Sequence, residues 1–180
     1  MNRRPVALTG VPGTGKSAVA ARLPAELRAV EVADLAIARG AGRRRSGGVV
    51  VDMDRLARSL ARRPEPGVAV YVGHLAHLLP VRRAIVLRCD PRELARRLAA
   101  RGDPPAERRE NLLCEAIDRI GAEAADRGRP VLEIDTTGRP IGAVARRVAM
   151  ALRRPGRGKS RPIDWLGTPE VTAHLLDWSR

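Results

Sequence analysis

The sequence predicts an α/β fold in which a parallel sheet is covered by helices on both faces. The first observation is that five short apolar runs alternate with segments of helical character along the chain. The second is that the first apolar run leads through a glycine-rich turn directly into the first helical segment. The length agrees, because 180 residues, at roughly 150 residues per domain, correspond to one compact domain with a tail.

The predicted strands are short runs of Val, Leu, Ile and Ala, which suit a sheet that is buried on both faces. They lie at residues 6–9, 30–33, 68–72, 84–87 and 131–134. The segments between them show helical spacing, and several begin with a proline or a capping aspartate. Helices are predicted at 16–23, from Asp52, from Pro91 after the cap Asp90, from Pro104 through Ala124, and at 139–152. Residues 36–48 are rich in arginine and glycine and predict a flexible loop.

The first loop has the spacing of a phosphate-binding motif. Residues 10–17 (GVPGTGKS) match G-x-x-x-x-G-K-[ST] between a predicted strand and a predicted helix. Glycines let backbone N–H groups turn toward an anion, and the N-terminus of the helix adds its positive end. Lys16 brings a charge to the β- and γ-phosphates, and the Ser17 hydroxyl is a ligand for Mg²⁺. The motif predicts binding of ATP with Mg²⁺ and leaves the acceptor open.

The net charge and the amino-acid composition limit the classes of partner that the protein is expected to bind. The chain carries 34 Lys and Arg against 20 Asp and Glu, a net charge of +14, and its only lysines are Lys16 and Lys159. The excess of arginine fits either a GC-rich genome or selection for anion binding. The three aromatic residues, Tyr71, Trp165 and Trp178, are too few to stack the bases of single-stranded RNA. Dispersed arginine pairs are typical of solvated helix faces, whereas the net charge favours salt-sensitive contact with rRNA.

Signals for disulfides, export and membrane anchoring are weak. Cys89 and Cys114 match neither a disulfide framework nor zinc spacing and are interpreted as core residues. The apolar run 6–9 is too short for a signal peptide. No apolar stretch reaches the ~18 residues of a transmembrane helix. We therefore expect a soluble, cytoplasmic protein with no membrane partner.

The chain is predicted to divide into a domain, 1–152, and a tail, 153–180. Residues 153–162 form an Arg/Pro/Gly-rich linker. Beyond the linker, apolar residues are expected either to fold back onto the domain or to dock on a partner. These are Trp165, Leu166, Leu175, Leu176 and Trp178.

Several stretches beyond the phosphate loop resemble one family. They are residues 32–35 (VADL), 51–56 (VDMDRL), 73–80 (GHLAHLLP), 86–91 (VLRCDP), 101–102 (RG) and 110–115 (ENLLCE). Over residues 5–152 the chain resembles the adenylate kinase isoenzyme 6-like family, and GHLAHLLP resembles its archaeal members. The resemblance implies a three-layer P-loop NTPase fold of the nucleoside monophosphate kinase type, with a five-stranded parallel sheet in the order 2-3-1-4-5.

The same resemblance implies a function and a site. Members of the family transfer phosphate from ATP to AMP, hydrolyse ATP, and are linked to small-subunit ribosome (rRNA) maturation through a ribosomal protein of the S11 type. Residues 31–53 would form a flap over the monophosphate, and residues 100–110 a short lid. The positions expected on ATP are Gly10, Gly13, Thr14, Gly15, Lys16, Ser17, Ala18 and Arg101. A cation beside Gly102 is also where a closing lid would supply charge to the transition state.

One position departs from the family pattern. Members of the family end the third strand with an acid two residues before the histidine, whereas this chain has Val72 before His74. Asp34, at the end of the second predicted strand, is the first substitute for that carboxylate toward Mg²⁺, and Asp52 is the second, each through water. His74 is a candidate to orient water or the γ-phosphate, and His77 is interpreted as structural. With Lys16, Arg101, His74 and Asp34 as catalytic candidates, the departure predicts weak catalysis.

Three functions stay open at this point. The first is an adenylate kinase with ATPase activity. The second is a nucleotide-switched ribosome assembly ATPase that binds a small-subunit ribosomal protein, with incidental kinase activity. The third is another small-molecule kinase of the same fold, such as a shikimate or gluconate kinase. A shikimate kinase is disfavoured because the second strand lacks paired aspartates and no triple-glycine turn follows the third strand.

Overall fold

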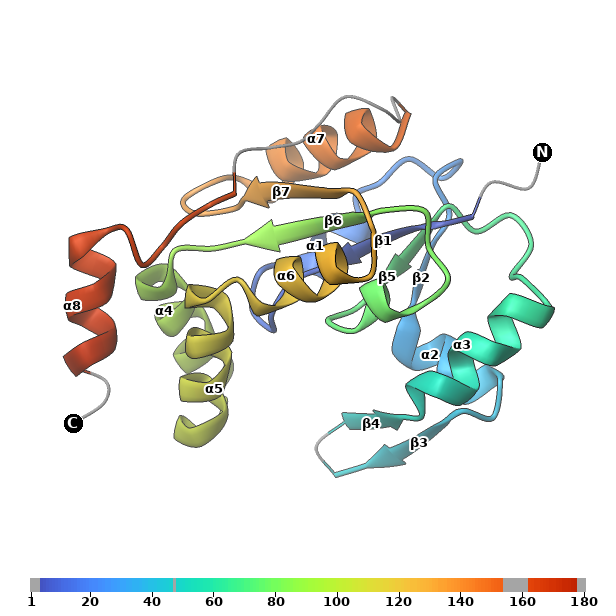
Figure 1. Ribbon diagram of the computed structural model, residues 1–180, viewed down its shortest axis with the longest axis horizontal. Helices are drawn as coiled ribbons and strands as arrows, with labels where there is room; N and C mark the ends of the chain where they lie inside the picture. The colour runs from blue at the N-terminus through green and yellow to red at the C-terminus, as the bar shows by residue number, and fades with distance from the viewer. Residues whose placement is uncertain (1–3, 47, 154–161, 178–180) are drawn as a thin grey trace.

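A five-stranded parallel sheet runs through the centre of the computed structural model, which describes residues 4–46, 48–153 and 162–177 (Figure 1). The strands are β1 (Val6–Thr9), β2 (Ala29–Glu31), β5 (Val70–Val72), β6 (Ala84–Arg88) and β7 (Val131–Asp135). They lie side by side in the order β2-β5-β1-β6-β7. Counted along the chain within this sheet alone, the order is 2-3-1-4-5, so the predicted topology is confirmed.

Burial explains why such short apolar runs form strands. Every residue of β1, β5 and β6 is buried, as expected for parallel strands covered on both faces. In the centre of the sheet, Leu8 of β1 lies opposite Val72 on one side and Ile85 on the other. The carboxyl ends of β1 and β5 therefore meet at one edge of the sheet, where the phosphate loop begins.

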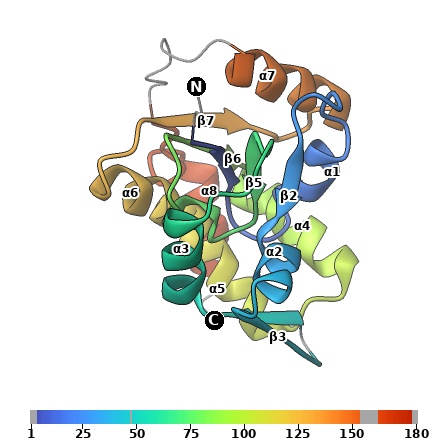
Figure 2. The ribbon, with the colours of Figure 1, turned by 90° about the vertical axis from the view of Figure 1, so that its right-hand side faces the viewer.

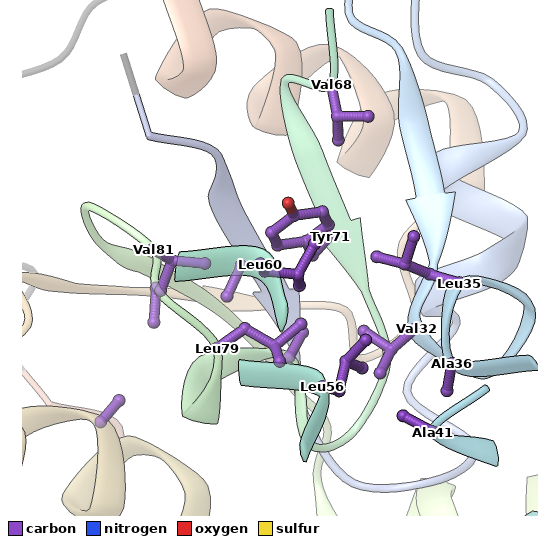
Figure 3. Packing of buried hydrophobic residues seen from close by; sticks show 14 of the residues in the cluster. Val32, Leu35, Ala36, Ala41, Leu56, Leu60, Val68, Tyr71, Leu79 and Val81 are labelled. Atoms are coloured by element: carbon purple, nitrogen blue, oxygen red, sulfur yellow. The ribbon is translucent and has the colours of Figure 1, made fainter. Parts of the chain in front are cut away.

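Helices cover both faces of the sheet (Figure 2). On one face, α1 (Lys16–Ala20) and α7 (Ile141–Arg153) pack around an aliphatic core. The other face is covered by α2 (Val32–Ala38), α3 (Met53–Arg62), the short 3₁₀ helix η1 (Ala76–Leu78) and α6 (Arg119–Asp126). Figure 3 shows this second core, where Leu56 and Leu60 of α3 share a cluster with Tyr71 of β5. The three-layer α/β prediction is thus confirmed.

A third, smaller core lies beyond the end of β6. It is built by α4 (Pro91–Arg101) and α5 (Pro105–Ala116), and Val11 of the phosphate loop packs into it. The start of α4 follows the sequence prediction, since Asp90 accepts the N–H of Arg92 at 2.8 Å and Pro91 is the first helical residue. Cys89 is fully buried and Cys114 partly buried at this core, and both are free thiols.

The arginine-rich segment 36–48 is not the flexible loop that the sequence predicts. Residues 36–38 complete α2, and β3 (Gly42–Arg45) pairs antiparallel with β4 (Gly48–Val51). This hairpin lies beside α2 and α3, away from the main sheet (Figure 1). The prediction failed because the three consecutive arginines of β3 are exposed and show no apolar alternation. Strand β3 is defined by its backbone pairing with β4, whose Val49 and Val51 are half-buried.

Two element boundaries also differ from the prediction. β2 ends at Glu31 and α2 begins at Val32, so Asp34 lies in the first turn of a helix and not at the end of a strand. The single helix predicted from Pro104 through Ala124 is divided into α5 and α6. Asp118 adopts a left-handed φ of 51° between them and caps α6 with its side chain, a conformation that aspartate tolerates better than most residues.

The described part of the tail folds back onto the domain. Helix α8 (Pro169–Asp177) packs against α4, with Val171 buried and Leu175 against the third core. Leu166 and Leu176 stay exposed. Trp178 and residues 154–161 of the linker lie outside the described residues.

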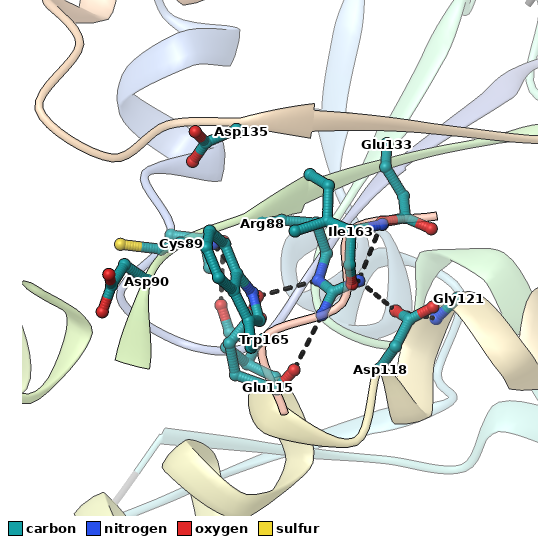
Figure 4. Close-up of polar contacts among 12 residues, drawn as sticks. Arg88, Cys89, Asp90, Glu115, Asp118, Gly121, Glu133, Asp135, Ile163 and Trp165 are labelled. Carbon is teal, nitrogen blue, oxygen red and sulfur yellow. Dashed lines mark hydrogen bonds and ion pairs between the residues drawn. The ribbon is translucent and has the colours of Figure 1, made fainter. Parts of the chain in front are cut away.

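A buried ion-pair cluster joins the tail to the sheet, and consists of Arg88, Glu115, Asp118 and Glu133 (Figure 4). The Arg88 guanidinium lies within 2.8 Å of an oxygen of each of the three carboxylates. Two tail groups complete the arrangement. Trp165 Nε1 donates to Glu115 Oε1 at 2.9 Å, and the backbone N–H of Ile163 donates to Glu133 at 2.8 Å.

Within the described ranges, the helices lack the length and apolar character needed to cross a membrane.

Candidate active site

A pocket of about 490 Å³ opens at the carboxyl ends of β1, β2 and β5. This is the edge where open parallel sheets bind their ligands. The pocket is lined by the phosphate loop and the start of α1, by the ends of β2 and β5, by the hairpin, and by α4. Its polar side chains are Lys16, Ser17, Glu31, His74, Arg97 and Arg101.

The phosphate loop has the backbone shape that its glycines predict. Gly10, Gly13 and Gly15 all adopt positive φ, which costs glycine little. A Cβ at Gly10 would lie 2.4 Å from the Leu87 carbonyl oxygen. The Thr14 side chain is buried and donates to the Val11 carbonyl at 2.9 Å. Gly10 and Thr14 therefore shape the loop from inside, while Gly13, Gly15, Lys16, Ser17 and Ala18 line the pocket.

Lys16 begins helix α1 at the floor of the pocket. Its ammonium donates to the Val11 carbonyl at 2.8 Å, within the loop itself. Burial lowers the pKa of Lys16 to about 8, and the positive charge of Arg101 acts in the same direction, whereas Glu31 opposes it. A lysine that is half-buried without a directly bonded carboxylate is poised to receive an anion.

Glu31 begins the predicted flap, but the sequence prediction gave its carboxylate no role. It ends β2, lines the pocket, and is the one carboxylate among the described residues that do so. Burial raises the pKa of Glu31, while hydrogen bonding from the Ser17 side chain and the charge of Lys16 lower it. The signal was present in the sequence, because the predicted strand 30–33 contains this one acid.

The two carboxylates that the sequence proposed for the metal lie elsewhere. Asp34 is exposed on α2 and does not line the pocket. Asp52 accepts the N–H of Arg55 at 2.9 Å as the cap of α3, and it lines a second pocket under the hairpin. The prediction placed Asp34 beside the loop because it extended β2 by two residues. The structure moves that position onto a helix.

The two histidines of the GHLAHLLP stretch have different environments. His74 lines the pocket, where desolvation lowers its pKa, as do the charges of Lys16 and His77. His77 is fully buried, with Nδ1 3.3 Å from Thr9 Oγ1 and Nε2 3.1 Å from Glu123. His77 therefore holds η1 against β1 and α6, which agrees with its structural interpretation.

Helix α4, which leads into the predicted lid (residues 100–110) and is called the lid helix below, contributes two arginines from one face. Arg101 is half-exposed at the end of the helix and donates from Nε to Asp103 at 2.6 Å. Arg97, four residues earlier, also lines the pocket and donates from Nη2 to the Thr136 carbonyl at 3.1 Å. Sequence reasoning missed Arg97, although the i, i+4 spacing to Arg101 places both on one helix face.

The flap region closes the opposite wall. Val49 and Val51 of β4 and Met53 of α3 line the pocket together with Val32 and Ala33. An apolar wall facing a basic wall suits a ligand with a base at one end and phosphates at the other. Among the described residues, no group of three or more His, Cys, Asp or Glu could hold a metal alone. A metal here would therefore depend on phosphate oxygens as well as on Ser17 and Glu31.

Comparison with known proteins identifies the family. A family model described as an AAA domain matches residues 6–118. Three archaeal proteins, each named "putative adenylate kinase", are similar over nearly the whole chain. The Thermococcus onnurineus protein is 35% identical over 162 residues (89% of this chain, 90% of the relative). The Archaeoglobus fulgidus protein is 40% identical over 171 residues (92% and 93%), and the Pyrococcus abyssi protein is 33% identical over 177 residues (97% of each). Among solved structures, TT1252 from Thermus thermophilus is 18% identical with a TM-score of 0.47, covering 87% of this chain and 100% of that chain.

The fold and the phosphate loop, with these relatives, define the class as a P-loop nucleotide kinase. The chain belongs to the family of these archaeal putative adenylate kinases, the family that the sequence resembles.

Proposed function

We propose that the protein transfers the γ-phosphoryl group of ATP to a nucleoside monophosphate, with AMP as the acceptor, and hydrolyses ATP as an accompanying reaction. The observation that carries this proposal is that one pocket is lined jointly by the phosphate loop, the flap and the lid helix. The pocket has a volume of about 490 Å³ and brings these three regions, which are proposed to hold the donor and the acceptor, to one place. The names of the archaeal relatives support the same reaction.

Phosphoryl transfer depends more on position and charge than on covalent chemistry of the protein. In our proposal the backbone N–H groups of the phosphate loop and the Lys16 ammonium hold the β- and γ-phosphates of ATP. Arg97 and Arg101 approach from α4 and neutralise charge on the moving group. Both lie on the wall opposite the flap, so they meet the phosphates where donor and acceptor face each other.

Mg²⁺ fits the donor set at the floor of this pocket. Ser17 offers a hydroxyl and Glu31 a carboxylate, the hard oxygen donors that Mg²⁺ prefers, with phosphates expected to complete the shell. When bound, the ion withdraws charge from the transferred phosphate. The chain holds these two side chains on adjoining elements, α1 and β2.

His74 is proposed to orient the attacking oxygen. Its lowered pKa keeps the imidazole neutral near pH 7, so that one ring nitrogen can accept a hydrogen bond from water while the N–H of the other can donate to a phosphate oxygen of the acceptor. A pocket at the surface admits water whenever the acceptor is absent. Hydrolysis of ATP then follows from the same geometry that serves transfer.

A second candidate is a role in small-subunit maturation, and the exposed arginines of the hairpin are the observation that favours it. Arg43, Arg44 and Arg45 are exposed along β3, and the net charge of +14 attracts polyanions such as rRNA. A basic ribosomal protein of the S11 type would be repelled by this charge. We therefore propose rRNA as the contact that the hairpin makes, and the nucleotide reaction as the primary activity.

The test combines purified protein with ATP, Mg²⁺ and each nucleoside monophosphate in turn, and measures ADP and free phosphate separately. ADP formed faster than phosphate, with AMP preferred, is the expected result. Phosphate formed at the rate of ADP whichever monophosphate is added would identify an ATPase and refute the kinase. Lys16→Ala should slow the formation of both products by about 10- to 150-fold, since each charge-assisted contact contributes about 1.5–3 kcal/mol.

A further inference from the structure

The end of strand β2 lies directly beside the end of β5. In the parallel pairing of these strands, Glu31 is the register partner of Val72. Both residues are the last of their strands, and both line the active-site pocket. Register partners in a parallel sheet point to the same face. A carboxylate at position 31 therefore reaches the space that a carboxylate at position 72 would reach.

Alternation along β2 fixes which face that is. Ala29 packs into the core beneath α1 and α7, and Val30 packs into the core on the opposite face. With a period of two, Glu31 returns to the α1 side. Val72 belongs to the same α1-side core. The Glu31 side chain thus faces the first turn of α1, which carries Lys16 and Ser17.

The electrostatic surroundings of Glu31 suit a cation. The carboxylate is half-buried among Ser17, Lys16 and the pocket wall. The Lys16 ammonium donates to the Val11 carbonyl rather than forming a close ion pair with this acid. A half-buried carboxylate beside a phosphate site repels the nucleotide unless a cation lies between them.

We infer that Glu31 supports the Mg²⁺ of the bound nucleotide beside Ser17, and that it supplies from β2 the carboxylate that Val72 does not provide from β5. This role rests on the proposed function, because it requires that the pocket bind a nucleotide with its metal. It replaces Asp34 and Asp52, which lie outside this pocket.

The test compares the wild type with Glu31→Gln, which keeps the size and polarity of the side chain and removes its charge. ADP affinity is measured by calorimetry, first in EDTA and then across a Mg²⁺ titration. Glu31→Gln should raise the Mg²⁺ concentration for half-maximal enhancement by about tenfold. In EDTA it should bind ADP as tightly as the wild type or more tightly, because one negative charge near the phosphates is gone.

Two further variants sharpen the comparison. Asp54→Asn removes an exposed carboxylate at the start of α3, and it should leave both affinities unchanged. Asp34→Asn tests the rival acid three residues beyond Glu31, and it should likewise leave the Mg²⁺ requirement unaltered. A purely structural effect of Glu31→Gln would weaken ADP binding in EDTA and in Mg²⁺ alike, so the opposite signs expected here exclude it.

The outcomes separate this inference from the proposed function. If the wild type binds ADP with a clear Mg²⁺ requirement and Glu31→Gln has the same requirement, the role of Glu31 is refuted while the kinase proposal stands. A shift produced by Asp34→Asn instead would assign the role to Asp34 and also overturn the inference. If the wild type binds no nucleotide in either condition, the proposed function itself fails.

Discussion

Raising the pH should weaken nucleotide binding through Lys16. The ammonium of this residue lies in the pocket, and burial lowers its pKa to about 8. Bound phosphates restore the charged form, since an opposite charge within a few ångströms raises the pKa of a lysine. Binding is therefore linked to proton uptake. The protonated protein binds tightly, and affinity is lost as the pH rises through the pKa of the free protein.

The size of the effect follows from that pKa. With a value of about 8, the free lysine is about nine-tenths charged at pH ~7 and about one-tenth charged at pH ~9. If only the charged form binds, affinity for ADP falls about tenfold over this interval, or about 1.4 kcal/mol. A lysine with its ordinary pKa of about 10.4 would change affinity by only a few per cent over the same interval.

The assay is a calorimetric titration of ADP with Mg²⁺ at several pH values in this range. Lys16→Arg is the matched control, because a guanidinium stays protonated throughout. Its absolute affinity is expected to be lower, but its pH dependence reports only the nucleotide and the other groups of the pocket. The ratio of the wild-type ADP affinity to that of Lys16→Arg should fall about tenfold between pH ~7 and pH ~9. Parallel curves for the two proteins would refute the reasoning.

Three further predictions concern the lid, the metal and the tail. Arg101→Ala should lower kcat more than it weakens ATP binding. The control Arg96→Ala, on the exposed side of α4, should change neither quantity. If Arg101→Ala lowers kcat and ATP affinity mildly and equally, Arg101 has only a surface role. In the Glu31→Gln background, Val72→Asp should lower the Mg²⁺ requirement again, and a folded double variant without recovery would contradict the equivalence of the two positions. Trp165→Phe removes a donor to the buried ion-pair cluster and should lower the free energy of unfolding in urea by about 1.5–3 kcal/mol; an unchanged denaturation midpoint would show that the tail is not anchored there.

Most of the fold could be predicted from the sequence because its signals are local. Strands β1, β5 and β6 are apolar runs that are buried on both faces, and helices α3 and α4 begin at the capping aspartates Asp52 and Asp90. The hairpin was missed because its strands are held by backbone pairing with exposed arginines. The break at Asp118 was missed because apolar spacing continues across it, while one left-handed residue redirects the chain.

The site could be predicted only as far as its motif reaches. The phosphate loop fixes Lys16 and Ser17 by spacing alone, and both line the pocket. Assigning Glu31 to the site requires the register of β2 against β5, which cannot be read from the sequence of either strand alone. Asp34 was misplaced because two residues at the end of β2 belong to a helix instead. The predicted strand was two residues too long, and this error directed the prediction to Asp34 instead of Glu31. Strands and helices present their side chains with different periods, so the misplaced boundary changed which side chain was expected at the pocket.

The buried ion-pair cluster gives the tail a physical reason to be part of the folded unit. Three carboxylates surround one guanidinium, and burial raises the pKa of Glu115 and that of Asp118, the latter to about 6, despite the adjacent charge of Arg88. Charges held at this depth need hydrogen bonds beyond the ion pairs, because an uncompensated buried charge costs about 3–5 kcal/mol. The tail supplies two of them, from Ile163 and Trp165. Docking of these groups brings α8 against α4, the helix that also carries Arg97 and Arg101. Residues 162–177 thus share a core with the helix that carries these two pocket arginines.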